Sequence, residues 1–595
     1  MLRFLQAALL ALAVSTLPGC GGSPAPPSAP PAARAASPDE RLARLVEQYW
    51  DESSRLKPRP LTEGAAIRYE PAAGFDISAQ SLADSLALER RYLDALLAVP
   101  RAGLDAESQL TYDIFKRERE LAIESFTYPF ELMPVNPFRS LPLEFARMGA
   151  GSGPYAVLSA QDYDAWRARA HAYARWTAQA IDNMREGLRR GYSVPRALVA
   201  EMLPILTALG ADRPQSVFYQ PLRSLPATLP PGERERLAAG ITAQVKEEIL
   251  PAYRTLATFL RDEYLPRARQ SLGLSALPLG PRWYAFLIRR ETASRLAPAD
   301  IHALGIAEVE RLHARLQALL SEAGFSGNAQ AFFEAAQRAP QVAFNTPQEL
   351  LDFYAQLKLS AAAALAALFA PGPQADFGIR PLDPSAAAGT PALSYQRATG
   401  RYPAVLHVDT ALQPLLPDTA LFLREALPGH HLQIATQQER SGLPRFRRFG
   451  GDPGFVEGWG LYAESLGEEL GLYRDTESKF ESLSDQLACA AALVVDTGLH
   501  ALGWTREQAV DYWRAQVPVD EAAANRAVDR ELALPAEGLA CGLGMHVLSG
   551  LRAHAEQVLG ARFDIRDFHS ELIDDGAMPL DILESAANLW LSRAH

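Results

Sequence analysis

The residues best suited to chemistry lie in two short stretches, REALPGHHLQ from position 424 and FVEGWGLYAE from position 455. In the first, Glu425 precedes His430 and His431 by five and six residues, and the second supplies Glu457. A catalytic zinc ion typically has three protein ligands and one open position for water. The combination therefore predicts one zinc ion, with His430, His431 and Glu457 as its candidate ligands, in a hydrolase.

The spacing requires a break in the helix between Glu425 and the histidines. On a regular helix Glu425 would lie about 140° from His430 and about 120° from His431 on the other side, so the three could not face one ion. Pro428 disfavours helical geometry before it, and Gly429 tolerates unusual dihedral angles. We therefore expect a kink at 428–429. A new helix would then run over 429–440, with these residues on one face: His430, Gln433 and Gln437.

Glu457 belongs to a predicted helix that also carries Glu464 and Glu468 on the same stripe. A stripe of carboxylates is most often solvated, and that is the alternative for Glu464 and Glu468. The glycines and aromatic residues around Glu457 favour a close, packed approach instead. We interpret Glu457 as a metal ligand, with Glu464 and Gln433 behind the ligands.

Asp496 and His500 form a third candidate group, because they are four residues apart on a predicted helix. A carboxylate in this position can orient a metal-bound or acid–base imidazole. The alternative is a histidine that only caps the end of its helix.

Most of the remaining chain has apolar residues at helical spacing. The predicted helices are 155–188, 233–268, 298–322, 347–369, 455–472, 480–502 and 505–515. A short apolar run, 404–408, predicts a strand just before the histidines. It is either an edge strand available to a peptide or a plain buried strand.

The amino terminus predicts export. Residues 1–20 combine Arg3, a short apolar run and the ending LPGC, which resembles a bacterial lipoprotein signal with Cys20 as the lipidated residue. An ordinary signal peptide is the alternative. Residues 21–37 are rich in Pro and Ala and predict an extended spacer, so the folded domain is expected over 38–595, held to a membrane of the cell envelope by its lipid.

Composition excludes one class of partner. The formal net charge of −12 argues against a general nucleic-acid surface. Cys489 and Cys541 are more simply interpreted as separate buried residues than as a disulfide.

These motifs together resemble the bacterial DUF885 family, which is grouped with gluzincin-type zinc metallopeptidases. The family segment H-E-A-x-P-G-H-H-x-Q matches 425–433, E-G-W-A-L-Y-x-E matches 457–464, and V-D-T-G-x-H matches 495–500. The closing pattern around 568–584 is also similar, so the resemblance covers most of residues 38–595.

The resemblance implies a mainly α-helical fold with a substrate channel between two helical halves, and the predicted strand at 404–408 adds a small β element near the metal. It implies that Glu425 activates a zinc-bound water for attack on peptide bonds. His500 or Tyr462 would stabilise the oxyanion.

Two departures from the family pattern oppose this reading. Arg424 stands where many relatives have a histidine, and a guanidinium cannot ligate zinc. The region at 535–542 lacks the Gln, Tyr and Lys of the family pattern P-G-Q-A-x-x-Y-K. Two hypotheses follow: an exported, zinc-dependent peptidase, or a catalytically impaired relative that binds peptides or an envelope partner.

Overall fold

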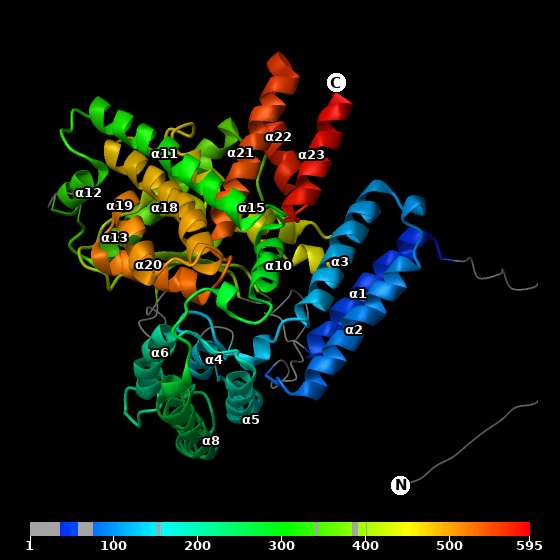
Figure 1. Ribbon diagram of the computed structural model, residues 1–595, viewed down its shortest axis with the longest axis vertical. Helices are drawn as coiled ribbons and strands as arrows, with labels where there is room; N and C mark the ends of the chain where they lie inside the picture. The colour runs from blue at the N-terminus through cyan, green and yellow to red at the C-terminus, as the bar shows by residue number, and fades with distance from the viewer. Residues whose placement is uncertain are drawn as a thin grey trace, which may run out of the picture.

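The computed structural model describes residues 36–56, 75–151, 155, 157–338, 343–382, 391–399 and 402–594. The predicted export signal, Cys20 and nearly all of the 21–37 spacer lie outside these residues. Within them the protein is mainly α-helical with one small sheet, as the sequence predicts (Figure 1).

The amino-terminal half forms two groups of helices. Helices α1 to α3 pack as an antiparallel bundle at one side of the molecule, and α4 to α9 form a separate lobe below the main body in Figure 1. Two π-helical turns, Val245–Ile249 and Leu260–Tyr264, continue α8 and α9 into the single long segment predicted over 233–268. The helices are α1 (Pro38–Leu56), α2 (Ala79–Leu97), α3 (Ala106–Ser125), α4 (Leu141–Gly149), α5 (Ala160–Arg190), α6 (Arg196–Leu209), α7 (Gln220–Arg223), α8 (Pro231–Gln244), α9 (Leu250–Phe259), α10 (Gly280–Thr292) and α11 (Pro298–Glu322).

The carboxy-terminal half carries every residue of the candidate site. Its long helix α18 lies against α11, where Gly305 allows close approach: a Cβ there would lie 2.8 Å from side-chain atoms of both Leu493 and Val494. The helices are α12 (Ala329–Arg338), α13 (Pro347–Ala364), α14 (Thr419–Glu425), α15 (His430–Glu439), α16 (Arg445–Arg448), α17 (Pro453–Ser465), α18 (Thr476–His500), α19 (Arg506–Gln516), α20 (Glu521–Ala533), α21 (Leu539–Leu559), α22 (Ile565–Ile573) and α23 (Leu580–Ala594).

A three-stranded sheet precedes the candidate site in the chain. It contains β1 (Phe377–Pro381), β2 (Leu393–Gln396) and β3 (Ala404–Val408) in the order β1-β3-β2. Strand β3 pairs with β1 in parallel and with β2 antiparallel. The interpretation of 404–408 as an edge strand is therefore wrong, because β3 is central and its backbone is paired on both sides.

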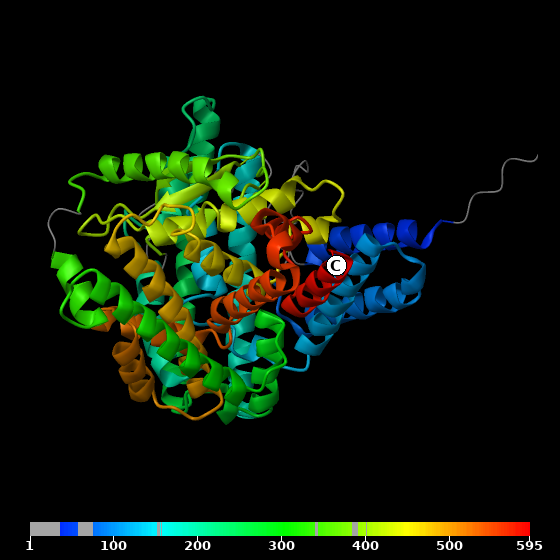
Figure 2. The same cartoon turned by 90° about the horizontal axis from the view of Figure 1, so that it is seen from above.

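The apolar side chains form two large cores. One joins α1–α3 and the sheet to α14–α17 and α21–α23, while the other joins α5–α9 to α11 and α18–α20. Figure 2 shows the carboxy-terminal helices between the amino-terminal bundle and the opposite end of the molecule. The candidate site lies where helices from both cores meet, at α14, α17 and α18.

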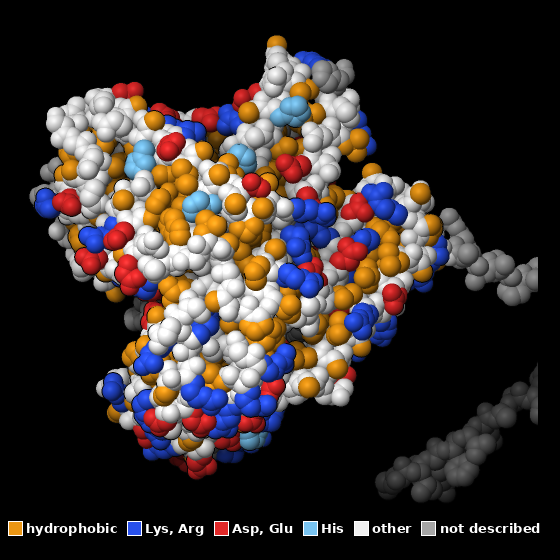
Figure 3. Space-filling model, in the orientation of Figure 1, with side chains coloured by type: hydrophobic (Ala, Val, Ile, Leu, Met, Phe, Trp, Pro, Cys, Tyr) orange, Lys and Arg blue, Asp and Glu red, His pale blue; other side chains and the backbone are white. Residues whose placement is uncertain are grey.

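The visible surface in Figure 3 mixes charges of both signs. Basic and acidic side chains alternate over the lower lobe, where α5, α6 and α8 lie. No helix in the described ranges is both long enough and apolar enough to cross a bilayer.

Candidate functional site

The helix breaks between Glu425 and His430, as the sequence predicts. Helix α14 ends at Glu425, and α15 begins at His430. The break requires glycine, because a Cβ on Gly429 would lie 1.8 Å from the carbonyl oxygen of Arg424. The turn brings Glu425 Oε1 to 3.9 Å from His430 Nε2, beyond hydrogen-bonding distance.

The other oxygen of Glu425 binds the sheet. Its Oε2 accepts a hydrogen bond from the backbone N–H of Tyr395 on strand β2, at 2.8 Å. This bond fixes the carboxylate between the outer edge of β2 and the imidazole of His430. Glu425 and His430 are thus neighbours from two helices, positioned by a backbone turn and a strand.

His431 lies in a different environment from His430, although the two are adjacent. Its Nε2 donates to the carbonyl of Ala375 at 3.1 Å, so Nδ1 is left to accept from the Tyr395 hydroxyl at 3.0 Å. Burial lowers the pKa of His431 to about 4. Both ring nitrogens are occupied, so this geometry does not support His431 as a metal ligand: its ring connects α15 to the residues around the sheet.

Glu457 pairs with Arg424. Arg424 Nη2 lies 3.3 Å from Glu457 Oε2, and the two side chains are 17% and 45% exposed. Burial alone would raise the pKa of Glu457, but the electrostatic effects of the neighbouring His430 and Arg424 outweigh it and hold that pKa below its ordinary value. The carboxylate predicted to bind a metal is therefore ionised and bound to the protein's own cation.

Two close contacts place α17 against the turn. The indole N–H of Trp459 donates to the carbonyl of Pro428 at 3.1 Å. Gly460 faces the site directly: a Cβ there would lie 2.7 Å from His430 Cε1 and 3.2 Å from Arg424 Cγ. The glycines noted in the sequence thus allow close approach, as expected.

A further glycine contact joins α17 to α21. A Cβ on Gly458 would lie 2.4 Å from the Cα of Gly544, so the two backbones are in contact. This crossing sets the position of Glu457 relative to the first turn of α21.

Glu464 and Gln433 lie in the interior. Glu464 is fully buried, and within the described ranges neither carboxylate oxygen has a hydrogen-bond partner. Burial, reinforced by the charge of Asp485, raises the pKa of Glu464 well above its ordinary value. The solvated alternative for Glu464 is therefore wrong. Gln433 donates to Gln437 at 2.7 Å, so its amide belongs to a buried amide network.

Tyr462 makes its hydrogen bond in the core. Its hydroxyl lies 2.9 Å from His569 Nε2, and His569 Nδ1 donates to the carbonyl of Leu368 at 2.8 Å. His569 Nε2 therefore accepts the hydroxyl proton of Tyr462. The assignment of Tyr462 as an oxyanion donor is not supported by this geometry, because its proton is already committed.

Asp496 and His500 do not form the expected pair. Asp496 accepts from the Tyr284 hydroxyl and from the backbone N–H of Ala536, the latter at 2.9 Å. Burial raises the pKa of Asp496 to about 7. The prediction that this carboxylate orients His500 is wrong, since both of its oxygens bind other groups.

His500 is bonded to backbone on both sides. Its Nδ1 accepts from the N–H of Leu274 at 3.2 Å, and its Nε2 donates to the carbonyl of Glu531 at 3.0 Å. It is 1% exposed, and burial lowers its pKa to about 4. His500 therefore joins three segments of the fold, and its predicted catalytic role is not supported by this position.

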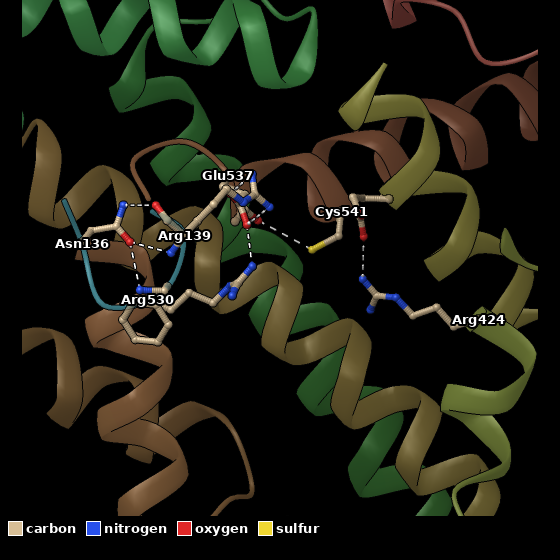
Figure 4. Close-up of polar contacts among 9 residues, drawn as sticks. Asn136, Arg139, Arg424, Arg530, Glu537 and Cys541 are labelled. Atoms are coloured by element: carbon tan, nitrogen blue, oxygen red, sulfur yellow. Dashed lines mark hydrogen bonds and ion pairs between the residues drawn. The ribbon is translucent and has the colours of Figure 1, made fainter. Parts of the chain in front are cut away.

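Sequence reasoning missed a group of residues on the far side of the Arg424–Glu457 pair. Arg139 Nη1 lies 2.8 Å from Glu537 Oε2, and Arg530 also pairs with Glu537. Figure 4 shows Arg139 and Arg530 directed toward Glu537, with Cys541 between this group and Arg424 in that view. Glu537 stands in the region that departs from the family pattern, which was the available signal.

Cys489 and Cys541 form a disulfide bond, with their Cα atoms 5.9 Å apart. The interpretation of two separate buried cysteines is wrong. The periodicity of α18 and α21 gives no indication that these positions face each other across the helix crossing.

The donor set does not fit a zinc ion. Across the ranges that the structure describes, no group of three or more His, Cys, Asp or Glu side chains is arranged to hold a metal. Arg424 occupies the position of the first histidine in the family pattern and forms an ion pair with Glu457. His431 has no free nitrogen. Of the three candidate ligands, only His430 and Glu457 lie beside Arg424. We call Arg424, Glu425, His430 and Glu457 the centre.

Comparison with known proteins agrees with the fold. A crystal structure described as "the putative lipoprotein from Colwellia psychrerythraea" is similar with a TM-score of 0.83 at 22% identity, covering 94% of this chain and 100% of that one. "A putative lipoprotein of unknown function from Shewanella oneidensis" has a TM-score of 0.69 at 15% identity, with the same coverage. No curated protein matches the sequence. The model of the family described as "Bacterial protein of unknown function (DUF885)" matches residues 73–586, so the chain belongs to the DUF885 family.

Proposed function

We propose that this protein is a membrane-associated protein of the cell envelope that binds peptides and does not hydrolyse them with a zinc-activated water. One observation carries the proposal: the ion pair between Arg424 and Glu457. Zinc hydrolysis requires ligands that are free to bind the ion. Here one ligand position is a permanent cation, and a second is a carboxylate bound to that cation.

The sheet edge favours a peptide as the ligand. Strand β2 is an edge strand, and the N–H of Tyr395 points away from β3 toward Glu425. Since backbone groups alternate in direction along an antiparallel strand, the outer edge of β2 faces the centre that contains Glu425 and His430. An extended peptide paired with this edge would replace Glu425 Oε2 as the acceptor for the Tyr395 N–H and would run directly past that centre.

The envelope location rests on two observations. Residues 1–20 end in a cysteine context similar to a lipoprotein signal, with Cys20 as the site of the lipid. The similar structures from Colwellia psychrerythraea and Shewanella oneidensis are both described as putative lipoproteins. A lipid on Cys20 followed by an extended spacer would hold the domain at the membrane surface.

Binding is tested with the full-length lipidated protein in detergent micelles. Fluorescence anisotropy of a labelled peptide library should give saturable binding that EDTA does not change, and mass spectrometry should show intact peptides. Peptides with N-methylated backbones should bind at least tenfold more weakly, because methylation removes the donors that strand pairing needs. Equal binding of methylated and unmethylated peptides would contradict the proposed mode.

A zinc-dependent peptidase is the second candidate. The proximity of Glu425 to His430 favours it, because a carboxylate beside an imidazole is suited to activating water. That function would appear as peptide cleavage that a chelator abolishes and that Glu425→Gln removes. Either result would replace the binding proposal.

A further inference from the structure

The guanidinium of Arg424 pairs with Glu457, and the Arg424 side chain lies close to His430. We infer that its guanidinium is the resident cation of this centre, taking the place of a divalent metal ion between His430 and Glu457, so that Arg424→His alone creates a metal site. This inference does not depend on peptide binding. It concerns which cation balances the carboxylates of the site.

The first support is the position of the arginine stem. Gly460 provides a common reference point: a Cβ there would lie 3.2 Å from Arg424 Cγ and 3.0 Å from His430 Nε2. The Arg424 side chain therefore leaves its backbone close to the free edge of the His430 ring. The Cγ of a histidine is the first atom of its ring. An imidazole at position 424 would therefore begin where Arg424 Cγ lies, close to the His430 ring.

The second support is that His430 is available. Its Nδ1 is buried and has no hydrogen-bond partner in the described part of the chain, and its Nε2 lies 3.9 Å from Glu425 Oε1, beyond hydrogen-bonding distance. His431 and His500 differ, since each has both nitrogens bonded. A buried imidazole with neither nitrogen hydrogen-bonded among the described residues is unusual, and its Nε2, on the side of Arg424, is free to bind a cation.

The third support is the charge around Arg424. Arg424 Nη2 lies 3.3 Å from Glu457 Oε2, and the adjacent carboxylate of Glu425 also acts electrostatically on this guanidinium. Removing the arginine would leave these carboxylates without their central positive charge. A divalent cation would then be attracted to the position that the guanidinium leaves.

The test is metal binding, measured on untagged full-length protein by competition with a chromogenic zinc chelator. Zinc affinity should increase in the order wild type, Arg424→Ala, Arg424→His, with at least a hundredfold difference between the first and the last. One Co²⁺ ion bound per chain of Arg424→His should give visible absorption of a low-coordinate site. Adding Glu457→Gln or His430→Ala to Arg424→His should reduce the affinity at least tenfold.

Arg139→His is the matched control, because it replaces an arginine that pairs with Glu537 and not with Glu457. It should bind zinc no better than the wild type. The inference is overturned if folded Arg424→His does not exceed Arg139→His, or if the wild type already binds one zinc ion that His430→Ala removes. If Arg424→His fails to fold, Arg424→Ala decides: affinity no higher than wild type contradicts the inference.

Discussion

His430 and His500 show how differently two buried histidines can be used in one protein. Both ring nitrogens of His500 are hydrogen-bonded to backbone groups from distant segments, so neither is free to bind another group. His430 is nearly as buried, yet it faces Arg424, Glu425 and Glu457 without a hydrogen bond among the described residues. His500 therefore stabilises the fold through its hydrogen bonds, whereas His430 belongs to a group of residues held together mainly by their charges.

The disulfide joins α18, the helix that ends at His500, to α21, and its loss should have the largest effect. Replacing both Cys489 and Cys541 by alanine opens a loop with a sequence separation of 52 residues. The chain-entropy model gives a loss of about 4 kcal/mol in unfolding free energy for a loop of this size. Urea unfolding of oxidised protein and the double variant would measure it, and equal midpoints would contradict it.

The His500 region should be the more sensitive to truncation. His500→Ala leaves the N–H of Leu274 and the carbonyl of Glu531 unbonded in the core, so we expect a loss of about 3 kcal/mol in unfolding free energy. His430→Ala breaks no such bond and should cost about 1 kcal/mol. A larger loss for His430→Ala, measured by denaturant unfolding, would reverse the comparison.

The same contrast predicts a pH dependence. The pKa of His500 is about 4 in the folded protein, and an unfolded histidine has a pKa near 6.5. The unfolded chain therefore binds the extra proton first, and stability falls as the pH decreases below about 6.5, by about 2 kcal/mol at pH 5 from this group. His500→Asn should lose less stability than wild type between pH 7 and pH 5, and parallel pH profiles would disprove it.

Two carboxylates on α17 provide the finest comparison. Glu457→Gln removes the partner of Arg424, but both groups are partly exposed, so the loss should be about 1 kcal/mol. Glu464→Gln should change stability by less than about 0.5 kcal/mol at pH 7, because the buried carboxyl is already held neutral by its raised pKa. Thermal unfolding in low salt measures the stability loss of both variants. A larger loss for Glu464→Gln than for Glu457→Gln would contradict this prediction.

The helices, the kink and the family could be predicted because they depend on local signals. Helical periodicity identified α11, α18 and α19, and the Pro–Gly pair indicated the break before α15. The direction of individual side chains could not be predicted in this way. His430 and His431 are adjacent, but the second turns toward β2 because a strand hydroxyl and a distant carbonyl lie there.

Pairings between distant segments were the main source of error. The Asp496–His500 spacing suggested a local pair, yet Tyr284 and Ala536 reach Asp496 from other elements. The Cys489–Cys541 bond likewise depends on how α18 meets α21. Such contacts follow from tertiary packing, which a local pattern does not contain.

The glycine crossing between α17 and α21 has a wider consequence. Because Gly458 and Gly544 meet backbone to backbone, the spacing between α17, which carries Glu457, and α21 is set by main chain. The polar groups mounted on that scaffold can therefore be exchanged without redesigning the helices that carry them. A substitution at Glu457 can then change the charge of the centre while this helix crossing stays unchanged.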